Sequence, residues 1–440
     1  MQLNRKPDHR VYTHEGAPAS ANVSTFDQLR RSVLSCFLWE KEFYEDGIEI
    51  AERIEVLARK CEPYNVAMLA VEAREQFHLR HVPLLLLNAL AATGAGIPLL
   101  VSNTIARVIQ RPDEMTEFLA IYWRNGRKPL SAQMKKGLRA AFAKFDAYQL
   151  AKYNRDGAVK LRDVMFLVHP HPTTIDQSNA WSKLADKRLE SPDTWEVSLS
   201  AGADKRETFT RLIQEGKLGY MALLRNLRNM QQSGVDKRLV TQAILERKGA
   251  DRVLPFRFVA AARAVPEYEP TLDKAMCAEI KRSQPMVGET IVLVDVSASM
   301  DAAISMRGDL SRMDAAATLA SIFPGKMRVF SFSTDVVEVP ARRGMAGIDA
   351  IKNSQHHGGT RLGRAIEYVN SLPHDRLVVI TDEQSQDRVQ DPRASKAYMI
   401  NVASNKNGVS YGPKWVHLDG FSESVLSFMR ELEGMTYTRY

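Results

Sequence analysis

The chain of 440 residues has little cysteine and no cysteine pattern. Its three cysteines, Cys36, Cys61 and Cys277, are far apart, odd in number and form no Cys-x-x-Cys pair. This usage gives no support to a disulfide framework of the kind found in secreted proteins. A reduced chain in the cytoplasm is the expectation.

Other signals are also missing. No apolar stretch reaches the ~20 residues of a membrane span, because Gly94, Gly96 and Pro98 interrupt the longest candidate. The N-terminal MQLNRKPDHR lacks the apolar segment of a secretory signal. No glycine-rich loop ends in Gly-Lys-Ser/Thr, so nucleotide hydrolysis has no support.

The positive charge is unevenly distributed. The net charge is +8, yet residues 286–440 contain 17 Lys and Arg against 18 Asp and Glu. All the excess positive charge therefore lies in the first 285 residues. This favours a polyanionic partner for that part of the chain, although solvated basic surface is the alternative for any single cluster.

The first part of the chain, after an irregular segment at 1–25, has the apolar period of helices. Helical spacing starts at Phe26 and continues, with short Pro or Gly breaks, to about Ala264. Expected helices in this part include Ile54–Lys60, Asn65–Phe77, Val82–Ala92, Asn103–Ile109, Met115–Arg124 and Ala132–Tyr153. Helix pairs in series predict an all-α, HEAT-like repeat domain over 26–285. This domain would form a solenoid or a ring. A ring closed within one chain would fit a monomer.

After a proline-containing linker, expected at 263–287, apolar strands alternate with helices. The strands are IVLVDV, MRVFSFS, VVEVP, RLVVIT and AYMINVA, and the helices include Met313–Ile322 and Leu362–Leu372. This alternation predicts an α/β domain with a parallel, doubly wound sheet over 286–440. Ligands of such sheets bind at the carboxyl ends of the strands, near a topological switch point.

Five oxygen-bearing side chains stand where this domain should bind a ligand. Two carboxylates end apolar strands and three hydroxyls follow in loops: Asp295, Ser297, Ser299, Thr360 and Asp382. Hard oxygen ligands suit a small divalent cation, and Mg²⁺ is the expected ion. The order Asp-x-Ser-x-Ser, then Gly-Gly-Thr, then a strand-terminal Asp matches the metal-ion-dependent adhesion site of a von Willebrand factor A domain. Because the site would contain only a few protein charges, the bound ion would stay electrophilic. It could then accept an acidic group from a partner protein.

Two other metal chemistries have weaker support. A metal nuclease would more often cluster acidic groups around two ions about 4 Å apart, and neither Asp301, Asp309 nor Glu383 completes a second-ion motif. His356 and His357 lack a third soft ligand at a useful spacing for zinc. Binding rather than catalysis is the prediction.

Several strings in the helical part, read with the metal motif, carry a resemblance. They are FLWEKEFYEDG, YQLAKYNRDG, VKLRDVMFLVHPHP, MALLRNLRNM and LPFRFVAA. The chain resembles the Ro ribonucleoprotein family, as a bacterial or phage-type member, from about Thr13 to its end. The resemblance implies a helical TROVE domain that forms a ring, closed by the von Willebrand factor A-like domain, in a protein that is not an enzyme.

The resemblance also implies partners and RNA-contacting residues. Single-stranded 3′ ends of misfolded RNA would enter the ring, Y RNA-like molecules would bind outside it, and such an RNA can tether polynucleotide phosphorylase. The family's Lys-Tyr pair matches Lys152 and Tyr153, with Arg155 after a one-residue shift, and its His-x-x-Pro element matches His169. Planar side chains can stack on unpaired bases. His169 could instead simply end a helix.

Arg225 and Arg228 are further candidates for RNA contact. They lie three residues apart and would share one face of a helix. They could line the ring or pair with acidic neighbours, and the two alternatives stay open. The competing hypothesis for the whole chain is a metal-dependent protein-interaction scaffold that binds no RNA. The excess positive charge in the first 285 residues disfavours it.

Overall fold

The computed structural model describes residues 24–34, 47–77, 79–154, 156–250, 253, 255–282, 285–303, 310–403, 414–419, 425–426, 429–430 and 433. Nearly all of the irregular segment predicted at 1–25 lies outside these residues, as do Cys36 and almost all of the string FLWEKEFYEDG. Among the described residues, no helix is both long and apolar enough to cross a lipid bilayer.

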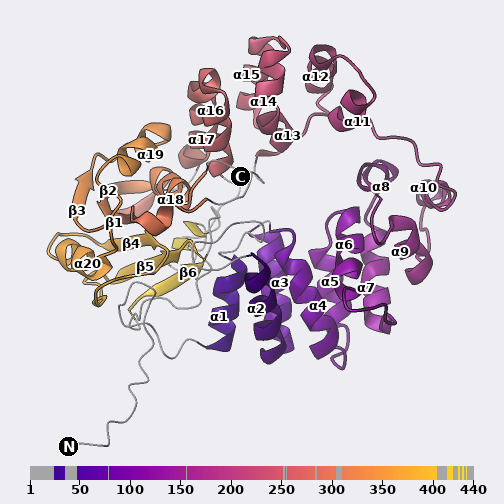
Figure 1. Cartoon of the computed structure of the whole chain (residues 1–440), viewed down its shortest axis with the longest axis horizontal. Coiled ribbons are helices and arrows are strands. Elements are labelled where there is room, and N and C mark those ends of the chain that lie inside the picture. Colours follow the sequence, from indigo (N-terminus) through magenta and orange to yellow (C-terminus); the bar gives the residue numbers. More distant parts are fainter. Residues whose placement is uncertain are drawn as a thin grey trace, which may run out of the picture. The chain divides into compact units, whose positions relative to one another are not determined.

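The chain divides into two compact units, each described here by itself. The helical unit comprises Ala51–Ala222 and Asn229–Val240, and the sheet unit comprises Met1–Ile50, Leu223–Arg228 and Thr241–Tyr440. Figure 1 shows the helices of the first and the sheet of the second.

The described elements from Thr25 to Ala264 are helices, as predicted, and helices continue beyond the expected end to Arg282. They are α1 (Thr25–Leu34), α2 (Gly47–Lys60), α3 (Pro63–Glu75), α4 (Val82–Thr93), α5 (Leu100–Val108), α6 (Pro112–Tyr122), α7 (Ala132–Phe142), α8 (Ala147–Tyr153), α9 (Leu161–Val168), α10 (Ile175–Ala185), α11 (Trp195–Ser200), α12 (Lys205–Gln214), α13 (Tyr220–Arg225), α14 (Leu227–Gln232), α15 (Lys237–Glu246), α16 (Phe256–Ala264), the short 3₁₀ helix η2 (Pro266–Tyr268) and α17 (Glu269–Arg282).

The helices of the helical unit stack in two layers. Helix α3 packs against α5, α5 against α7 and α7 against α9, while α4 packs against α6 and α6 against α8. This alternation is the packing of a helical repeat, and it confirms the repeat architecture. Gly137 brings α7 close to α5, since a Cβ there would lie 2.7 Å from the Ser102 carbonyl oxygen and 2.8 Å from Ile105 Cβ. The closed ring stays a prediction.

Apart from shifted helix ends, the structure differs from the expectation at two places. The helix predicted over Ala132–Tyr153 is two helices, because Asp146 caps α8 by accepting a hydrogen bond from Gln149 N at 2.7 Å. The linker predicted at 263–287 is largely helix α17, whose Pro270 lies in the first turn, where its missing N–H costs nothing.

The sheet unit contains β1 (Met286–Asp295), β2 (Gly325–Phe332), β3 (Val336–Val339), β4 (Arg376–Thr381), β5 (Lys396–Asn401) and β6 (Val416–Asp419) in the order β3-β2-β1-β4-β5-β6. Its other elements are η3 (Ala298–Asp301), α18 (Arg312–Ser321), α19 (Met345–Lys352) and α20 (Leu362–Asn370). The doubly wound α/β prediction is confirmed, with one difference. Strand β3 runs antiparallel to β2, because only residues 333–335 join them and a parallel return needs a longer crossover.

The core and the strand order of the sheet unit define the edge of the sheet where a ligand is expected to bind. Leu362, Ile366 and Val369 of α20 pack on Leu293 and Val379, which alternate along β1 and β4. Strand β1 pairs in parallel with β2 on one side and with β4 on the other. The chain reverses direction across the sheet between β1 and β4, which makes their carboxyl ends the topological switch point.

Candidate functional site

The two predicted metal-binding carboxylates lie at this switch point. Asp295 ends β1, Asp382 directly follows β4, and both side chains are fully buried. Thr381 Oγ1 donates a hydrogen bond of 2.6 Å to Asp295 Oδ2, and Ser297 N donates one of 2.9 Å to Oδ1. Gln384 N donates to Asp382 Oδ1 at 3.1 Å. Local hydrogen bonds therefore fix the orientation of both carboxylates.

The three predicted hydroxyl ligands lie in loops that are joined to each other. Ser297 Oγ and Ser299 Oγ are 3.2 Å apart, and both side chains are buried. Ala298 N donates to the Gly358 carbonyl at 3.1 Å, which joins the first loop to the Gly-Gly-Thr loop. Gln386 N donates to the carbonyl of buried Thr360 at 2.8 Å, which joins that loop to the one after β4. The fold thus brings all five residues to one edge of the sheet.

The electrostatics of this edge fit a cation. Burial, together with the nearby charge of Asp382, raises the pKa of Asp295 well above its usual range. Two buried carboxylates that repel each other are stabilised by a positive ion between them. Among the described residues no group of three or more His, Cys, Asp or Glu is placed to hold a metal. A site here depends on two carboxylates and hydroxyl oxygens, a donor set suited to Mg²⁺.

His357, beside the candidate site, makes two contacts within the protein. His357 Nδ1 lies 3.0 Å from Asp301 Oδ2, and its Nε2 lies 2.9 Å from the Lys352 carbonyl oxygen. Both ring nitrogens of His357 are therefore used within the protein. A metal at His357 would have to replace one of these two contacts.

The predicted RNA-contacting residues of the helical unit lie at helix ends. Lys152 and Tyr153 end α8, and both are partly exposed. The guanidinium carbon of Arg111 lies 4.3 Å from the centroid of the Tyr153 ring, and Lys152 Nζ lies 5.8 Å from it. Two basic side chains thus lie near the ring, of which Arg111 is also paired with Asp113, Nη2 to Oδ2 at 2.7 Å. Arg155 lies outside the described residues.

His169 is exposed and ends α9 in a left-handed conformation, with φ of 47°. Its N–H donates to the Met165 carbonyl at 2.9 Å. The backbone of His169 therefore has the helix-ending role that the sequence left open. Its exposed ring stays a candidate for RNA contact.

Arg225 and Arg228 do not share one helix, so the predicted common helix face was wrong. Arg225 ends α13 and Arg228 lies in α14, because the helix is interrupted at buried Asn226. Both arginine side chains are exposed. Arg228 donates to the Ala264 carbonyl through Nε and Nη2, each at 3.4 Å. No pairing of these two arginines with a carboxylate is seen among the described residues.

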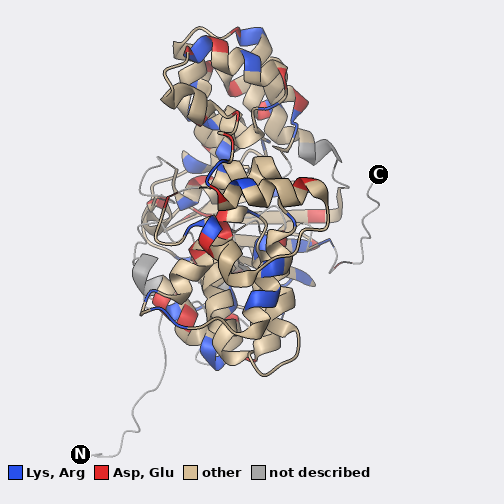
Figure 2. Cartoon of the chain, turned by 90° about the vertical axis from the view of Figure 1, so that its right-hand side faces the viewer, with Lys and Arg blue, Asp and Glu red and all other residues tan. Residues whose placement is uncertain are grey.

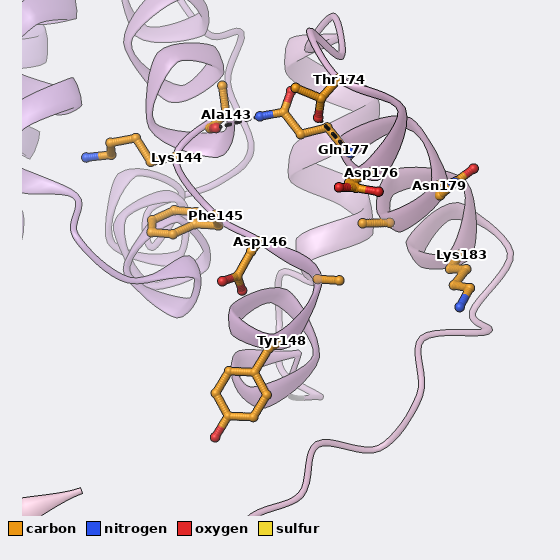
Figure 3. Close-up of a pocket in the computed structure, with 12 residues that line it drawn as sticks. Ala143, Lys144, Phe145, Asp146, Tyr148, Thr174, Asp176, Gln177, Asn179 and Lys183 are labelled. Atoms are coloured by element: carbon orange, nitrogen blue, oxygen red, sulfur yellow. Dashed lines mark hydrogen bonds between the residues drawn. The ribbon is translucent and has the colours of Figure 1, made fainter. Parts of the chain in front are cut away.

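Charges of both signs occur on the helices (Figure 2). One pocket of the helical unit, with a volume of about 610 Å³, has charges of both signs in its wall. Lys183, Asp146 and Asp176 all line it, and Gln177 Nε2 crosses from α10 to donate to the Ala143 carbonyl at 3.0 Å (Figure 3). Lys144 Nζ instead donates to the backbone carbonyls of Ala106, in the last turn of α5, and Ile109, directly after it. Two carboxylates in its wall make this pocket a poor path for phosphates.

Comparisons with known proteins agree with this architecture. Residues 176–307 match the TROVE domain, and residues 271–397 match the VWA domain containing CoxE-like protein. The chain therefore carries a TROVE domain followed by a VWA-type domain. The resemblance to the Ro family is confirmed in domain composition and fold: the crystal structure of the Deinococcus radiodurans RO (RSR) protein superposes with a TM-score of 0.61 and 17% identity, over 94% of this chain and 100% of that one.

Curated relatives match over a shorter stretch. Telomerase protein component 1 of Mus musculus is 38% identical over 90 residues, which is 19% of this chain and 3% of the relative. The Rattus norvegicus protein of the same name is 34% identical over 106 residues, or 23% of this chain and 4% of the relative. The chain thus spans only a small part of these relatives.

Proposed function

We propose that this protein binds RNA through its TROVE region, as a Ro-type protein rather than an enzyme. The observation that carries the proposal is the TROVE match at residues 176–307 within a fold that follows the Ro structure over 94% of the chain. The excess positive charge of the first 285 residues supports it, because Lys and Arg supply phosphate contacts. The matched relatives are named as components of telomerase.

The RNA we propose is small, structured and non-coding, with a single-stranded end. Partly exposed Tyr153 beside Arg111 and Lys152, together with exposed His169, suits stacking on unpaired bases. Y RNA-like molecules and 3′ ends of misfolded RNA have this character. A role in RNA quality control follows, with an exoribonuclease such as polynucleotide phosphorylase recruited through the RNA.

We propose further that Asp295, Ser297, Ser299, Thr360 and Asp382 bind one divalent cation, Mg²⁺. The two buried, mutually repelling carboxylates support this assignment. When bound, the ion would offer an open position to an acidic group of a protein partner.

Sequencing of the RNA that copurifies with the protein tests the RNA proposal. Defined small RNAs with single-stranded tails support it, whereas RNA no more abundant than in a mock purification refutes it. Incubation with single-stranded RNA and Mg²⁺ tests the distinction from a nuclease. We expect intact RNA, and cleavage that disappears in Asp295→Ala would overturn the assignment as a binding protein.

A further inference from the structure

A second pocket of the helical unit lies where α6 ends. It has a volume of about 390 Å³, within the range of small-ligand sites, and Ala120, Trp123, Arg124, Arg127, Val159 and Asp163 line it. Trp123 is the C-cap of α6, and Val159 and Asp163 come from the segment that leads into α9. We call this the Trp123 pocket.

The aromatic wall of the pocket is Trp123, and the side chain of Arg127 lies over its ring. The guanidinium carbon of Arg127 lies 5.0 Å from the centroid of the Trp123 ring. Trp123 Nε1 donates to the Lys128 carbonyl at 2.8 Å, which fixes the orientation of the indole. Arg127 is exposed and makes no ion pair or hydrogen bond with the part of the chain that the structure describes. Its planar face and its N–H groups are therefore available to a ligand.

The polar groups of the pocket differ in their availability. Arg124 is paired with Glu55, so its charge is compensated within the protein. Asp163 Oδ2 accepts a hydrogen bond from Lys160 N at 3.0 Å. Asp163 is exposed, and no contact of its Oδ1 is seen within the described residues. The pocket thus combines a planar cation on an aromatic ring with one free carboxylate oxygen.

This chemistry favours a nucleobase over a phosphate. A base can stack on the guanidinium plane of Arg127, as bases do on arginine and aromatic side chains. A carboxylate oxygen accepts hydrogen bonds from the amino and imino groups of bases. The same oxygen repels a phosphate, so the sugar-phosphate chain should stay outside while a base enters.

The position of the pocket connects it with the predicted RNA contacts. Arg111, the N-cap of α6, covers Tyr153, while Trp123 is the C-cap of the same helix. The 11 residues of α6 separate the two ends by about 16 Å at the rise of an α-helix. A single strand that follows α6 could contact both places. Lys128 Nζ, 4.1 Å from the Tyr122 ring centroid, adds positive charge beside the pocket.

We propose that the Trp123 pocket binds one unpaired base of the RNA, stacked on Arg127 and hydrogen-bonded to Asp163. This inference rests on the proposed RNA binding and adds a base-specific site to it. It makes Arg127 and Asp163 RNA-contacting residues, with Trp123 holding Arg127 in place from below, and gives the protein a preference for sequence at one nucleotide.

The test uses the full-length protein and an unstructured single-stranded RNA of about 12 nucleotides, a length typical for such sites. Arg127→Ala should weaken binding about tenfold, the usual effect of losing one stacked base. Arg127→Lys should weaken it similarly, because it keeps the charge but loses the planar group. Lys136→Ala is the matched control, since Lys136 is exposed on α7, and it should change affinity little.

Quenching of tryptophan fluorescence reports on the base directly. RNA should quench wild type, and Trp123→Phe should retain binding but lose most of the quenching. Normal affinity in Arg127→Lys, or unchanged quenching in Trp123→Phe, would refute the pocket while leaving RNA binding intact. A wild-type protein that binds no RNA would instead refute the proposed function itself.

Discussion

Arg263 of α16 holds Asp314 of α18 with two hydrogen bonds, Nη1 to Oδ2 at 2.7 Å and Nη2 to Oδ1 at 2.6 Å. Asp314 also accepts from Lys352 Nζ at 2.5 Å and from Ser311 N at 2.8 Å. The residue pair joins a helix of the TROVE match to the helix that follows the candidate metal loop, within one compact unit. The last TROVE helices are therefore structurally part of the sheet unit.

Loss of Arg263 should destabilise the sheet unit. The Asp314 side chain is 1% exposed, so Arg263→Ala leaves a buried carboxylate with fewer partners. Breaking such a pair typically costs 3–5 kcal/mol, and because Lys352 remains and Arg263 is half-exposed we expect about 2 kcal/mol. Urea denaturation of Arg263→Ala against wild type measures the change in the free energy of unfolding. Arg364→Ala, at an exposed ion pair with Asp335, is the control.

The same pair should make stability depend on acid pH. Burial would raise the pKa of Asp314, but hydrogen bonds from Arg263 and Lys352 outweigh it and hold the pKa below its usual range. A group with a depressed folded-state pKa contributes stability above its unfolded value, about 3.9, and loses it as the pH falls through the folded value. Denaturation midpoints measured from about pH 5 down to about pH 3 should fall less steeply in Asp314→Asn than in wild type. Equal slopes would show that Asp314 does not contribute.

Mg²⁺ should stabilise the sheet unit if the five oxygen ligands bind it. An ion that binds only the folded state at about 100 times its Kd adds about 2.7 kcal/mol. Thermal denaturation with EDTA and with excess Mg²⁺ should therefore differ for wild type but not for Asp382→Asn. Asp301→Asn, at an exposed carboxylate outside the five, should keep the response to Mg²⁺. A response that survives in Asp382→Asn would argue against the assigned site.

Gly137→Ala should destabilise the helical unit, although alanine is the better helix former by about 1 kcal/mol. The new methyl would lie 2.7 Å from the Ser102 carbonyl oxygen and 2.8 Å from Ile105 Cβ, so α5 and α7 would have to separate. Overpacking of this kind costs about 1–3 kcal/mol. Gly96→Ala, where nothing lies within 4 Å, is the control for the change of residue type. A more stable Gly137→Ala would show that the helices adjust freely.

Sequence predicted best what depends on local pattern. The candidate metal residues end apolar strands, and parallel strands bring their carboxyl ends to one edge whatever else the chain does. The break before α8 could have been found, because Asp146 and Gln149 form a capping box. The basic and aromatic residues of YWRNGRK at 122–128 were likewise visible as a signal. The strand β6 is only four residues long and was missed.

Long-range pairs could not be predicted in this way. Arg263 and Asp314 are 51 positions apart, and nothing local to either residue indicates the other. The layer packing that places Arg111 over Tyr153 depends on how α6 and α8 stack, which the helical period alone leaves undefined. Assignment of Arg225 and Arg228 to one helix failed, because the break at Asn226 between α13 and α14 has no proline or glycine to signal it.

Lys152 and Tyr153 should contribute to RNA binding in different ways. Lys152 would contact phosphate, so Lys152→Ala should weaken binding of all single-stranded sequences and reduce the slope of log affinity against log salt by about one. Tyr153→Ala should lower the affinity by about tenfold through lost stacking, with the salt slope unchanged. Titrations at several salt concentrations separate the two effects. Tyr153→Phe keeps the aromatic ring over which Arg111 lies and on which a base would stack. It should therefore keep most of the affinity. A flat salt dependence in wild type would contradict phosphate contacts as the basis of RNA binding.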